Sequence, residues 1–352
     1  MKTTIFTGPK KLEIHEVERP EVQPSQVLVK TRAVGLCTLE QRFYLGSSPE
    51  SYPFLGGHEV AGEVVVVGSQ AMTKAQVGDV VCLALLTRCG TCYYCRRGMD
   101  NLCIHNQESR TAGRIPGPAG LSEYIVAEDY QVYTTDLPPT PNHDEAWECR
   151  LCELALAEPV ACVIRSVQAP PIQFGDLVLV QGAGIMGLLH VQLLRQRGAR
   201  IVMAEPNEQR QQMALRAGAD WVVNPLTTNL AGFLRERSDG YGVNAAFFTA
   251  GGAPAIEQAM QGMAKGAWLS LYGSVHPKGP IQIDPNWVHY NEWVIMGSFS
   301  HTNSSFQQAV AMIASRKVDT GLFVSERVAF PQVDYAFERA TSPDTYRVVM
   351  TF

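Results

Sequence analysis

The chain has 352 residues, of which 46% are hydrophobic and 18% charged, and its formal net charge is −5. A globular protein with two cores is expected, because single cores stop growing at roughly 250 to 300 residues. The mild negative charge and the lack of long lysine or arginine runs argue against a nucleic-acid binder, and the lack of an apolar stretch of about 20 residues argues against a membrane partner.

The N-terminal part of the chain, from Ile14 to Tyr133, contains β-branched runs such as QVLVKTRAVG and HEVAGEVVVVG between glycine and proline turns. This pattern predicts an all-β domain. The start MKTTIFTGPKKLEIHEV has no apolar signal segment, and clustered cysteines fit a reducing compartment, so we expect a cytoplasmic protein. The proline-rich stretch LPPTPN at 137–142 is the expected domain boundary.

Four cysteines lie close together in the run RCGTCYYCRRGMDNLC, namely Cys89, Cys92, Cys95 and Cys103. Thiolates at this spacing can surround one Zn²⁺ tetrahedrally, and such a closed site stabilises a loop without taking part in chemistry. Two disulfides, or buried thiols without a shared role, are the alternatives. We predict a zinc-binding lobe at residues 88–104, called the four-cysteine lobe below.

The second half of the chain, up to about Ile283, alternates predicted strands with amphipathic helices, as in LVLVQGAG followed by IMGLLHVQLLRQRG. This alternation predicts a parallel sheet with crossover helices. The tail, with a helix in SSFQQAVAMIASRKV and a strand in YRVVMTF, is expected to rejoin the first domain. The predicted domains are therefore residues 1–150 with 290–352, and residues 151–289.

A glycine-rich turn, G-x-G-x-x-G, follows an apolar strand and opens a helix, at Gly182, Gly184 and Gly187. Such glycines permit a tight turn, close approach of a pyrophosphate and close helix packing, while the helix N-terminus attracts phosphates. The turn therefore predicts a dinucleotide site that includes Ile185 and Met186. A glycine-rich turn in an unrelated α/β sheet is the alternative.

Glu205 ends the next apolar strand, eighteen residues after Gly187. A carboxylate at this point accepts hydrogen bonds from the adenosine ribose diol and repels a 2′-phosphate, which favours NAD over NADP. Arg210 follows closely enough to neutralise Glu205 and weaken that discrimination.

A second metal site is indicated by Cys37 in AVGLCTLE and by His58 and Glu59 in FLGGHEVAG. Glu158, in LALAEPVACVI, is a further carboxylate that can serve as a fourth or exchangeable ligand. Each residue alone is explained as well by a core or loop role. Beside the glycine-rich turn and the four-cysteine lobe, however, three or four S, N and O ligands with an open position are typical of a catalytic zinc.

Together these motifs resemble one family. GLC, GGHEVAGEV, GDVV, CGTCYYCRRGMDNLC, SEYIV, AEPVA and GAGIMG occur in the order and spacing of the zinc-dependent medium-chain dehydrogenase/reductase family, alcohol dehydrogenase type, and cover essentially the whole chain. Glu59 and Glu158 make the chain more similar to the polyol and threonine dehydrogenase branch. The resemblance implies an α/β protein with a GroES-like β-rich catalytic domain and a Rossmann domain, two zinc ions per chain, NAD(H), and a homodimer or homotetramer.

The resemblance also implies a reaction. Zinc on Cys37 and His58, with Glu59 and Glu158 as ligands or holders of water, would act as a Lewis acid on a small secondary alcohol, whose hydride passes to nicotinamide. We expect a polyol, cyclitol or amino alcohol, or the corresponding ketone in reverse. An L-threonine dehydrogenase or a biosynthetic ketone reductase is an alternative, and so is a nucleotide-binding structural or regulatory protein that has lost its chemistry.

The proton relay of the family is altered in this chain. Family members carry a hydroxyl residue two places after the ligand cysteine, whereas here Leu39 stands there, between Thr38 and Glu40. The proton can leave through Thr38, or through Glu59 or Glu158 and water, and the sequence does not choose. Glu40 either replaces the usual aspartate or only braces the local fold.

The predicted substrate pocket also departs from the family. Similar polyol dehydrogenases have an arginine just after the phenylalanine of the GSF segment, whereas here Phe299, an expected cofactor contact, is followed by Ser300 and His301. Without a guanidinium group, a sugar acid fits poorly. Phe43, Tyr44 and His301 are the predicted substrate contacts, and packing against their own scaffold is the alternative.

The segment NHDEAWECRLCELAL at 142–156 is longer and more polar than the corresponding family segment. It places Cys149 and Cys152 one turn apart on a predicted helix, which fits either simple packing or a C-x-x-C redox or metal pair. An inserted helix beside the cleft, or at a subunit contact, is the hypothesis.

Overall fold

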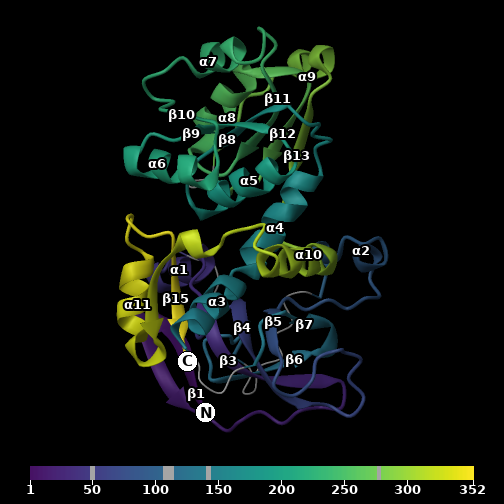
Figure 1. Cartoon of the computed structure of the whole chain (residues 1–352), viewed down its shortest axis with the longest axis vertical. Helices are drawn as coiled ribbons and strands as arrows, with labels where there is room; N and C mark the ends of the chain where they lie inside the picture. Colours follow the sequence, from purple (N-terminus) through teal and green to yellow (C-terminus); the bar gives the residue numbers. More distant parts are fainter. Residues whose placement is uncertain (48–51, 106–114, 140–143, 276–278) are drawn as a thin grey trace. The chain divides into compact units, whose positions relative to one another are not determined.

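The structure is a computed structural model, and it describes residues 1–47, 52–105, 115–139, 144–275 and 279–352. Figure 1 follows the chain through these ranges. No helix within them combines the length and the apolar character that a membrane span requires.

The chain forms two compact units, one of residues 1–161 with 301–352 and one of residues 162–300. The domain boundaries predicted from the sequence lie shortly before these divisions. The proline-rich segment at 137–142 extends beyond residue 139 and so lies partly outside the described residues.

The first unit is built on a seven-stranded, mostly antiparallel sheet of order β14-β15-β3-β4-β5-β7, with β6 also paired to β3. Its strands are β3 (Gln26–Gly35), β4 (Glu59–Val67), β5 (Val80–Ala84), β6 (Tyr124–Glu128), β7 (Val132–Thr134), β14 (Val324–Ala329) and β15 (Arg347–Thr351). A separate hairpin consists of β1 (Lys2–Gly8) and β2 (Lys11–Glu16). Because β15 pairs with β3, the C-terminal tail rejoins the first unit as predicted.

The helices of this unit are α1 (Thr38–Leu45), α2 (Tyr93–Arg96), α3 (Glu145–Ala155), the start of α4 (Ala157–Gln168), α10 (Asn303–Ala314) and α11 (Val333–Ala340). Helix α3 contacts β3 and β4, and its N-cap Asp144 accepts a hydrogen bond from the Trp147 N–H. Cys152 on α3 is buried and Cys149 is half-buried. The predicted helix is therefore confirmed, with Cys152 packed against its own domain.

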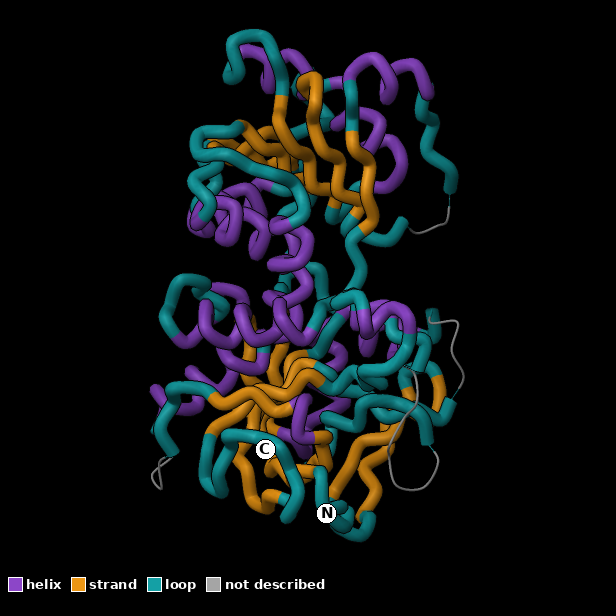
Figure 2. Tube along the Cα trace, turned by 90° about the vertical axis from the view of Figure 1, so that its right-hand side faces the viewer, coloured by secondary structure: helices purple, strands orange, loops and turns teal. Residues whose placement is uncertain are grey.

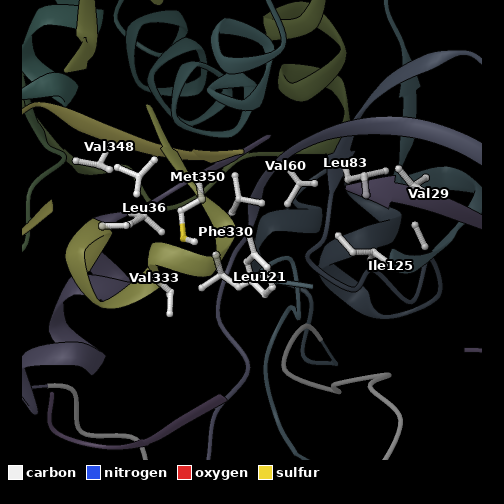
Figure 3. Close-up of a cluster of buried hydrophobic side chains, with 14 of the residues drawn as sticks. Val29, Leu36, Val60, Leu83, Leu121, Ile125, Phe330, Val333, Val348 and Met350 are labelled. Atoms are coloured by element: carbon white, nitrogen blue, oxygen red, sulfur yellow. The ribbon is translucent and has the colours of Figure 1, made fainter. Parts of the chain in front are cut away.

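The core of the first unit lies on the seven-stranded sheet. Figure 3 shows side chains from β3, β4, β5 and β15, among them Val29, Val60, Leu83 and Met350, gathered in one apolar cluster. Burial of these alternating strand residues fixes the register of the sheet, since a slip of one residue would turn them to the other face.

Helix α1 follows β3, and it buries two residues that were predicted to contact substrate. The Phe43 ring, fully buried, stacks on Phe54 with centroids 3.8 Å apart, and the Tyr44 ring stacks on Phe337 at 5.3 Å. Because both rings lie on the inward face of a short helix, they belong to the core. The prediction that Phe43 and Tyr44 line the substrate pocket is therefore wrong.

Replacing Phe43 by alanine tests this correction. Phe43→Ala should lower the free energy of unfolding by about 3–5 kcal/mol, because it opens a cavity in the core. Urea denaturation measures the loss, and Met72→Ala, at a side chain that is 91% exposed, should leave stability unchanged. Wild-type stability with an altered Michaelis constant for substrate would support the pocket interpretation instead.

The second unit contains a six-stranded parallel sheet of order β10-β9-β8-β11-β12-β13. Its strands are β8 (Leu177–Gln181), β9 (Arg200–Ala204), β10 (Trp221–Val223), β11 (Val243–Phe248), β12 (Met263–Leu271) and β13 (Val294–Gly297). Its helices, besides the end of α4, are α5 (Ile185–Gln196), α6 (Glu208–Ala217), α7 (Leu230–Glu236), α8 (Gly252–Gln261) and α9 (Pro285–Asn291). Figure 2 shows helices on both faces of this sheet, which confirms the doubly wound arrangement.

The strand order reverses between β8 and β11, which are neighbours in the sheet although β9 and β10 lie between them in the sequence. In open α/β sheets a ligand binds at the carboxyl ends of the strands at such a switch point. The turn after β8 and the residue after β9 are therefore placed where a nucleotide site is expected.

Candidate active site and metal centres

Three candidate ligands meet where β3 ends and β4 begins. Cys37 is the N-cap residue of α1 just after β3, His58 directly precedes β4, and Glu59 is its first residue. Antiparallel pairing places Gly35 opposite Glu59. The ligand atoms of Cys37, His58 and Glu59 consequently lie within 4.8 Å of one another. These residues are called the three-ligand site below.

Glu59 is an unusually buried carboxylate. Its side chain is fully buried, and its Oε1 lies 3.0 Å from Nη2 of Arg347, yet neither carboxylate oxygen makes a hydrogen bond of acceptable geometry within the described residues. Burial raises the pKa of Glu59 to about 7, against the opposing effect of Arg347. A buried carboxylate of this kind, next to a thiol and an imidazole, fits a divalent cation such as zinc.

The neighbouring glycine makes room for this carboxylate. A Cβ atom at Gly35 would lie 2.1 Å from Glu59 Oε2 and 3.0 Å from the Leu156 side chain. A larger residue at position 35 would therefore displace Glu59 from the three-ligand site.

Glu40 orients His58. Its Oε1 lies 2.7 Å from His58 Nδ1 and accepts the Gly57 N–H at 2.9 Å. Burial raises the pKa of Glu40, but the interactions with His58 outweigh burial and lower it, while the same pair raises the pKa of His58 despite burial. Because Nδ1 is engaged, Nε2 is the ring nitrogen left for a metal. Glu40 therefore does more than brace the local fold, because it orients a candidate metal ligand.

Arg347 is the functional residue that sequence analysis missed. Its side chain is 2% exposed, its Nη1 donates to the Leu36 carbonyl at 2.8 Å, and its Nη2 pairs with Glu59. A fully buried arginine is rare unless it is paired. The signal available in the sequence was a single cation at the start of the apolar strand RVVMT.

Glu158 does not join the three-ligand site in this structure. It lies in the first turn of α4, is 9% exposed, and has its Oε1 4.0 Å from His301 Nε2. Burial raises the pKa of Glu59, and Arg347 and His58 oppose the shift. The negative charge of Glu158 is a smaller effect that also raises the pKa of Glu59. Its predicted role as a metal ligand stays a prediction.

His301 is buried beside this carboxylate. Its side chain is 1% exposed, and its ring centroid lies 5.1 Å from that of Phe306. Burial lowers the pKa of His301 to about 4, although Glu158 opposes the shift. His301 thus lies next to a candidate ligand, and a direct substrate contact stays a prediction.

The two residues after Cys37 lie at the surface. Thr38 and Leu39 occupy the first turn of α1 and are both exposed, Leu39 by 38%. Thr38 therefore carries an exposed hydroxyl directly after Cys37 in the sequence.

The four cysteines of the four-cysteine lobe converge as predicted. The sulfur atoms of Cys89, Cys92, Cys95 and Cys103 lie within 4.8 Å of one another. The Cys92 N–H donates to Cys89 Sγ at 3.2 Å, and such backbone hydrogen bonds lower the pKa of Cys89 to about 5. All nine cysteines of the chain are free, so a disulfide framework is not formed. Four convergent sulfurs with backbone donors fit a closed zinc site.

The glycine-rich turn has the geometry that a dinucleotide requires. Gly182 has a φ of 92°, and a Cβ atom at Gly187 would lie 1.8 Å from the Gly182 carbonyl oxygen. Gly184 is the N-cap of α5, whose first residues are Ile185 and Met186. Since only glycine allows this approach, the helix N-terminus lies open to a phosphate.

Glu205 lies against the same turn. Its Oε2 accepts the Ala183 N–H at 2.8 Å and its Oε1 accepts the Asn207 N–H at 2.9 Å. The guanidinium of Arg210 lies over the turn, with Nη1 3.8 Å from the position of a Cβ at Gly184. The Glu205 carboxylate, fixed by two backbone donors, retains lone pairs for the hydroxyls of a ribose.

Phe299, the predicted cofactor contact, is 67% exposed, and its carbonyl accepts a hydrogen bond from Arg165 at 3.4 Å.

Comparison with known proteins agrees with both halves of this geometry. Residues 23–138 match the alcohol dehydrogenase GroES-like domain and residues 186–315 match the zinc-binding dehydrogenase domain. The chain belongs to the zinc-dependent medium-chain dehydrogenases. The resemblance, the GroES-like and Rossmann fold and the assignment as an enzyme are thereby confirmed.

Individual relatives cover nearly the whole dehydrogenase. An L-threonine 3-dehydrogenase of Pyrococcus abyssi is 29% identical over 96% of this chain and 94% of the relative. A sorbitol dehydrogenase of Bacillus subtilis is 27% identical over 97% and 93%, respectively. A putative zinc-binding dehydrogenase from Sinorhizobium meliloti, solved with NADP, superposes with a TM-score of 0.87 at 23% identity and covers 100% of this chain and 99% of its own.

The matched families establish the class of reaction and the cofactors of this chain. The chain is an oxidoreductase that acts on a small-molecule alcohol and uses zinc and a nicotinamide dinucleotide. The alternative of a nucleotide-binding protein without chemistry is set aside, because the family assignment and the three-ligand site agree.

Two cysteine variants distinguish a structural zinc site from ordinary thiol packing. Cys103→Ser should lower the thermal unfolding temperature and release one zinc ion per chain, because the four-cysteine lobe loses a ligand. Cys149→Ser, at a half-buried cysteine outside both clusters, is the control and should change neither. Metal analysis and thermal unfolding measure both effects. Unchanged zinc content in Cys103→Ser would contradict the closed site.

Proposed function

We propose that the three-ligand site binds the catalytic zinc of an NAD-dependent dehydrogenase for small secondary alcohols. The observation that carries this proposal is the meeting of Cys37, His58 and the buried, hydrogen-bond-deficient Glu59 at one strand junction. The four-cysteine lobe supplies a second, structural zinc site, so the protein would hold two zinc ions per chain.

The chain's own residues would hold this site in a fixed geometry. When bound, zinc supplies Lewis-acid polarisation of the alcohol oxygen, and the nicotinamide accepts the hydride. Glu40 fixes the tautomer of His58, and Arg347 holds Glu59 while its Nη1 is anchored to the Leu36 carbonyl. Removal of such supporting partners typically lowers metal affinity or activity by about 10- to 100-fold.

Thr38 is our proposed first relay of the alcohol proton, because its hydroxyl can accept that proton while it donates its own proton to solvent water. It is exposed and adjacent to Cys37, whereas Glu59 is fully buried and paired with Arg347. Leu39, at the position that carries the hydroxyl in similar enzymes, offers no proton-accepting group.

A polyol, cyclitol or amino alcohol is the substrate class we propose. Relatives that cover almost the whole chain carry the names L-threonine 3-dehydrogenase and sorbitol dehydrogenase. L-threonine carries an amino group beside its hydroxyl group, and sorbitol is a polyol. L-threonine itself is the second candidate because several of these relatives bear that name. Ser300 and His301 follow Phe299, so no arginine immediately after Phe299 binds a substrate carboxylate.

We further propose NAD as the cofactor, a homodimer or homotetramer, and a cytoplasmic location. Glu205, fixed by two backbone N–H groups, would repel the 2′-phosphate of NADP. Nine free cysteines, of which eight belong to the two proposed metal sites or are buried, fit a reducing compartment. The assembly is proposed from the family alone.

The catalytic assignment is tested by Cys37→Ser. The variant should lose at least about 100-fold in kcat with polyols, cyclitols and amino alcohols, and should retain one zinc ion per chain, because the four-cysteine lobe is untouched. Turnover is followed by the absorbance of the reduced nicotinamide, and circular dichroism controls for folding. A folded Cys37→Ser enzyme with wild-type turnover would overturn the assignment.

Cofactor preference is tested by Glu205→Ala. The Michaelis constant for NAD should rise about tenfold and the preference for NAD over NADP should fall, because hydrogen bonds to an ionised carboxylate are lost along with its repulsion of phosphate. Kinetics with both cofactors measure the change, and Glu208→Ala, on the first turn of α6, serves as an exposed control. An unchanged ratio would refute the ribose role of Glu205.

A further inference from the structure

His301 is a buried imidazole whose ring nitrogens make no hydrogen bond with the residues that the structure describes. The Thr302 backbone lies near the ring, but no hydrogen bond of acceptable geometry joins the two. Buried polar groups normally have a partner, so an unpartnered one calls for an explanation. Glu158 is the carboxylate next to the ring, with its Oε1 4.0 Å from Nε2, about 1 Å longer than an N–H···O hydrogen bond.

The backbone on both sides of this ring is anchored to the four-cysteine lobe. Arg88 Nη2 donates to the His301 carbonyl at 2.9 Å, and Asp100 Oδ2 accepts the Asn303 N–H at 3.0 Å. Arg88 Nε also lies 3.6 Å from Asp100 Oδ2. The Phe306 ring packs against the His301 ring at a tilt, and Ser300, just before His301, has a φ of 61°, a strained conformation for serine. The imidazole is therefore held in place from several directions.

Glu158 has two possible partners, the ring of His301 and the metal of the three-ligand site. It begins α4, is within electrostatic range of Glu59 and Arg347, and yet is not among the ligand atoms that lie within 4.8 Å of one another. A carboxylate at this position can either approach the metal or pair with the imidazole. The fixed position of His301 favours the second orientation.

We propose that His301 is a positioning residue that binds the Glu158 carboxylate through its Nε2–H and keeps it away from the metal of the three-ligand site. One coordination position thereby stays available for the alcohol oxygen, since open positions distinguish catalytic from structural zinc. Without His301, Glu158 would become the fourth ligand and compete with substrate. This inference rests on the proposed catalytic zinc.

Two substitutions test the role of the Nε2–H group. His301→Leu keeps a side chain of similar size but removes the Nε2–H donor. His301→Gln places an amide N–H near the position of Nε2. The rate at which a chromogenic chelator removes the catalytic zinc from the holoenzyme is measured together with the Michaelis constant for the alcohol. Cys37→Ser identifies which phase of zinc release belongs to the catalytic site.

His301→Leu should release the catalytic zinc about tenfold more slowly and raise the Michaelis constant about tenfold, as expected for loss of a hydrogen bond to a charged group. His301→Gln should behave like the wild type. In the double variant His301→Leu/Glu158→Gln both effects should vanish, because a neutral amide is a poor fourth ligand.

Three results would overturn the proposal: unchanged zinc release in His301→Leu, faster release in that variant, or an effect that persists in the double variant. The proposed function fails separately, and it does so if the wild-type enzyme oxidises no alcohol or holds no zinc that Cys37→Ser removes. This inference alone is refuted if the wild-type enzyme oxidises an alcohol and holds that zinc, but His301→Leu changes neither zinc release nor the Michaelis constant.

Discussion

The antiparallel pairing of β3 with β4 is the constraint on which the three-ligand site depends. Cys37 and the His58–Glu59 pair are separated in the sequence by 20 residues or more, and only the register that sets Gly35 opposite Glu59 brings them together. That register is fixed by buried residues such as Val29 and Val60, because a shift of one position would turn the core face outward. Core packing therefore sets the geometry of the ligands.

The buried acidic groups at this strand junction favour a bound cation. Cys37, Glu40 and Glu59 bring acidic groups into a buried region, where Arg347 pairs with Glu59 and His58 pairs with Glu40. Burial and the charge of Glu59 raise the pKa of Cys37, although His58 and Arg347 oppose the shift, so these two residues alone do not stabilise a Cys37 thiolate. A divalent cation would bind the Cys37 sulfur, the His58 nitrogen and the Glu59 carboxylate together. These residues therefore fit zinc better than a purely structural ion-pair network.

Sequence patterns were sufficient to predict both sheets, the glycine-rich turn and the convergence of the four cysteines. Alternating and continuous apolar runs report burial directly, and short spacings such as that of Cys89 and Cys92 constrain geometry locally. The misplacement of Phe43 and Tyr44 has a different cause. Aromatic residues near a ligand look alike in sequence whether they face a pocket or a core, and only the contacts of α1 with Phe54 and Phe337 decide between the two.

Pairs of residues that lie far apart in the sequence could not be predicted either. Arg347 lies far from Glu59 in the sequence, and nothing local to the C-terminal strand indicates which carboxylate it pairs with. The most direct test of the account is anomalous X-ray scattering at the zinc edge from crystals of the purified enzyme. It should show two ions per chain, one among the four cysteines and one bound by Cys37, His58 and Glu59. A single ion at the cysteines, with Glu59 paired only to Arg347, would contradict the proposed catalytic centre.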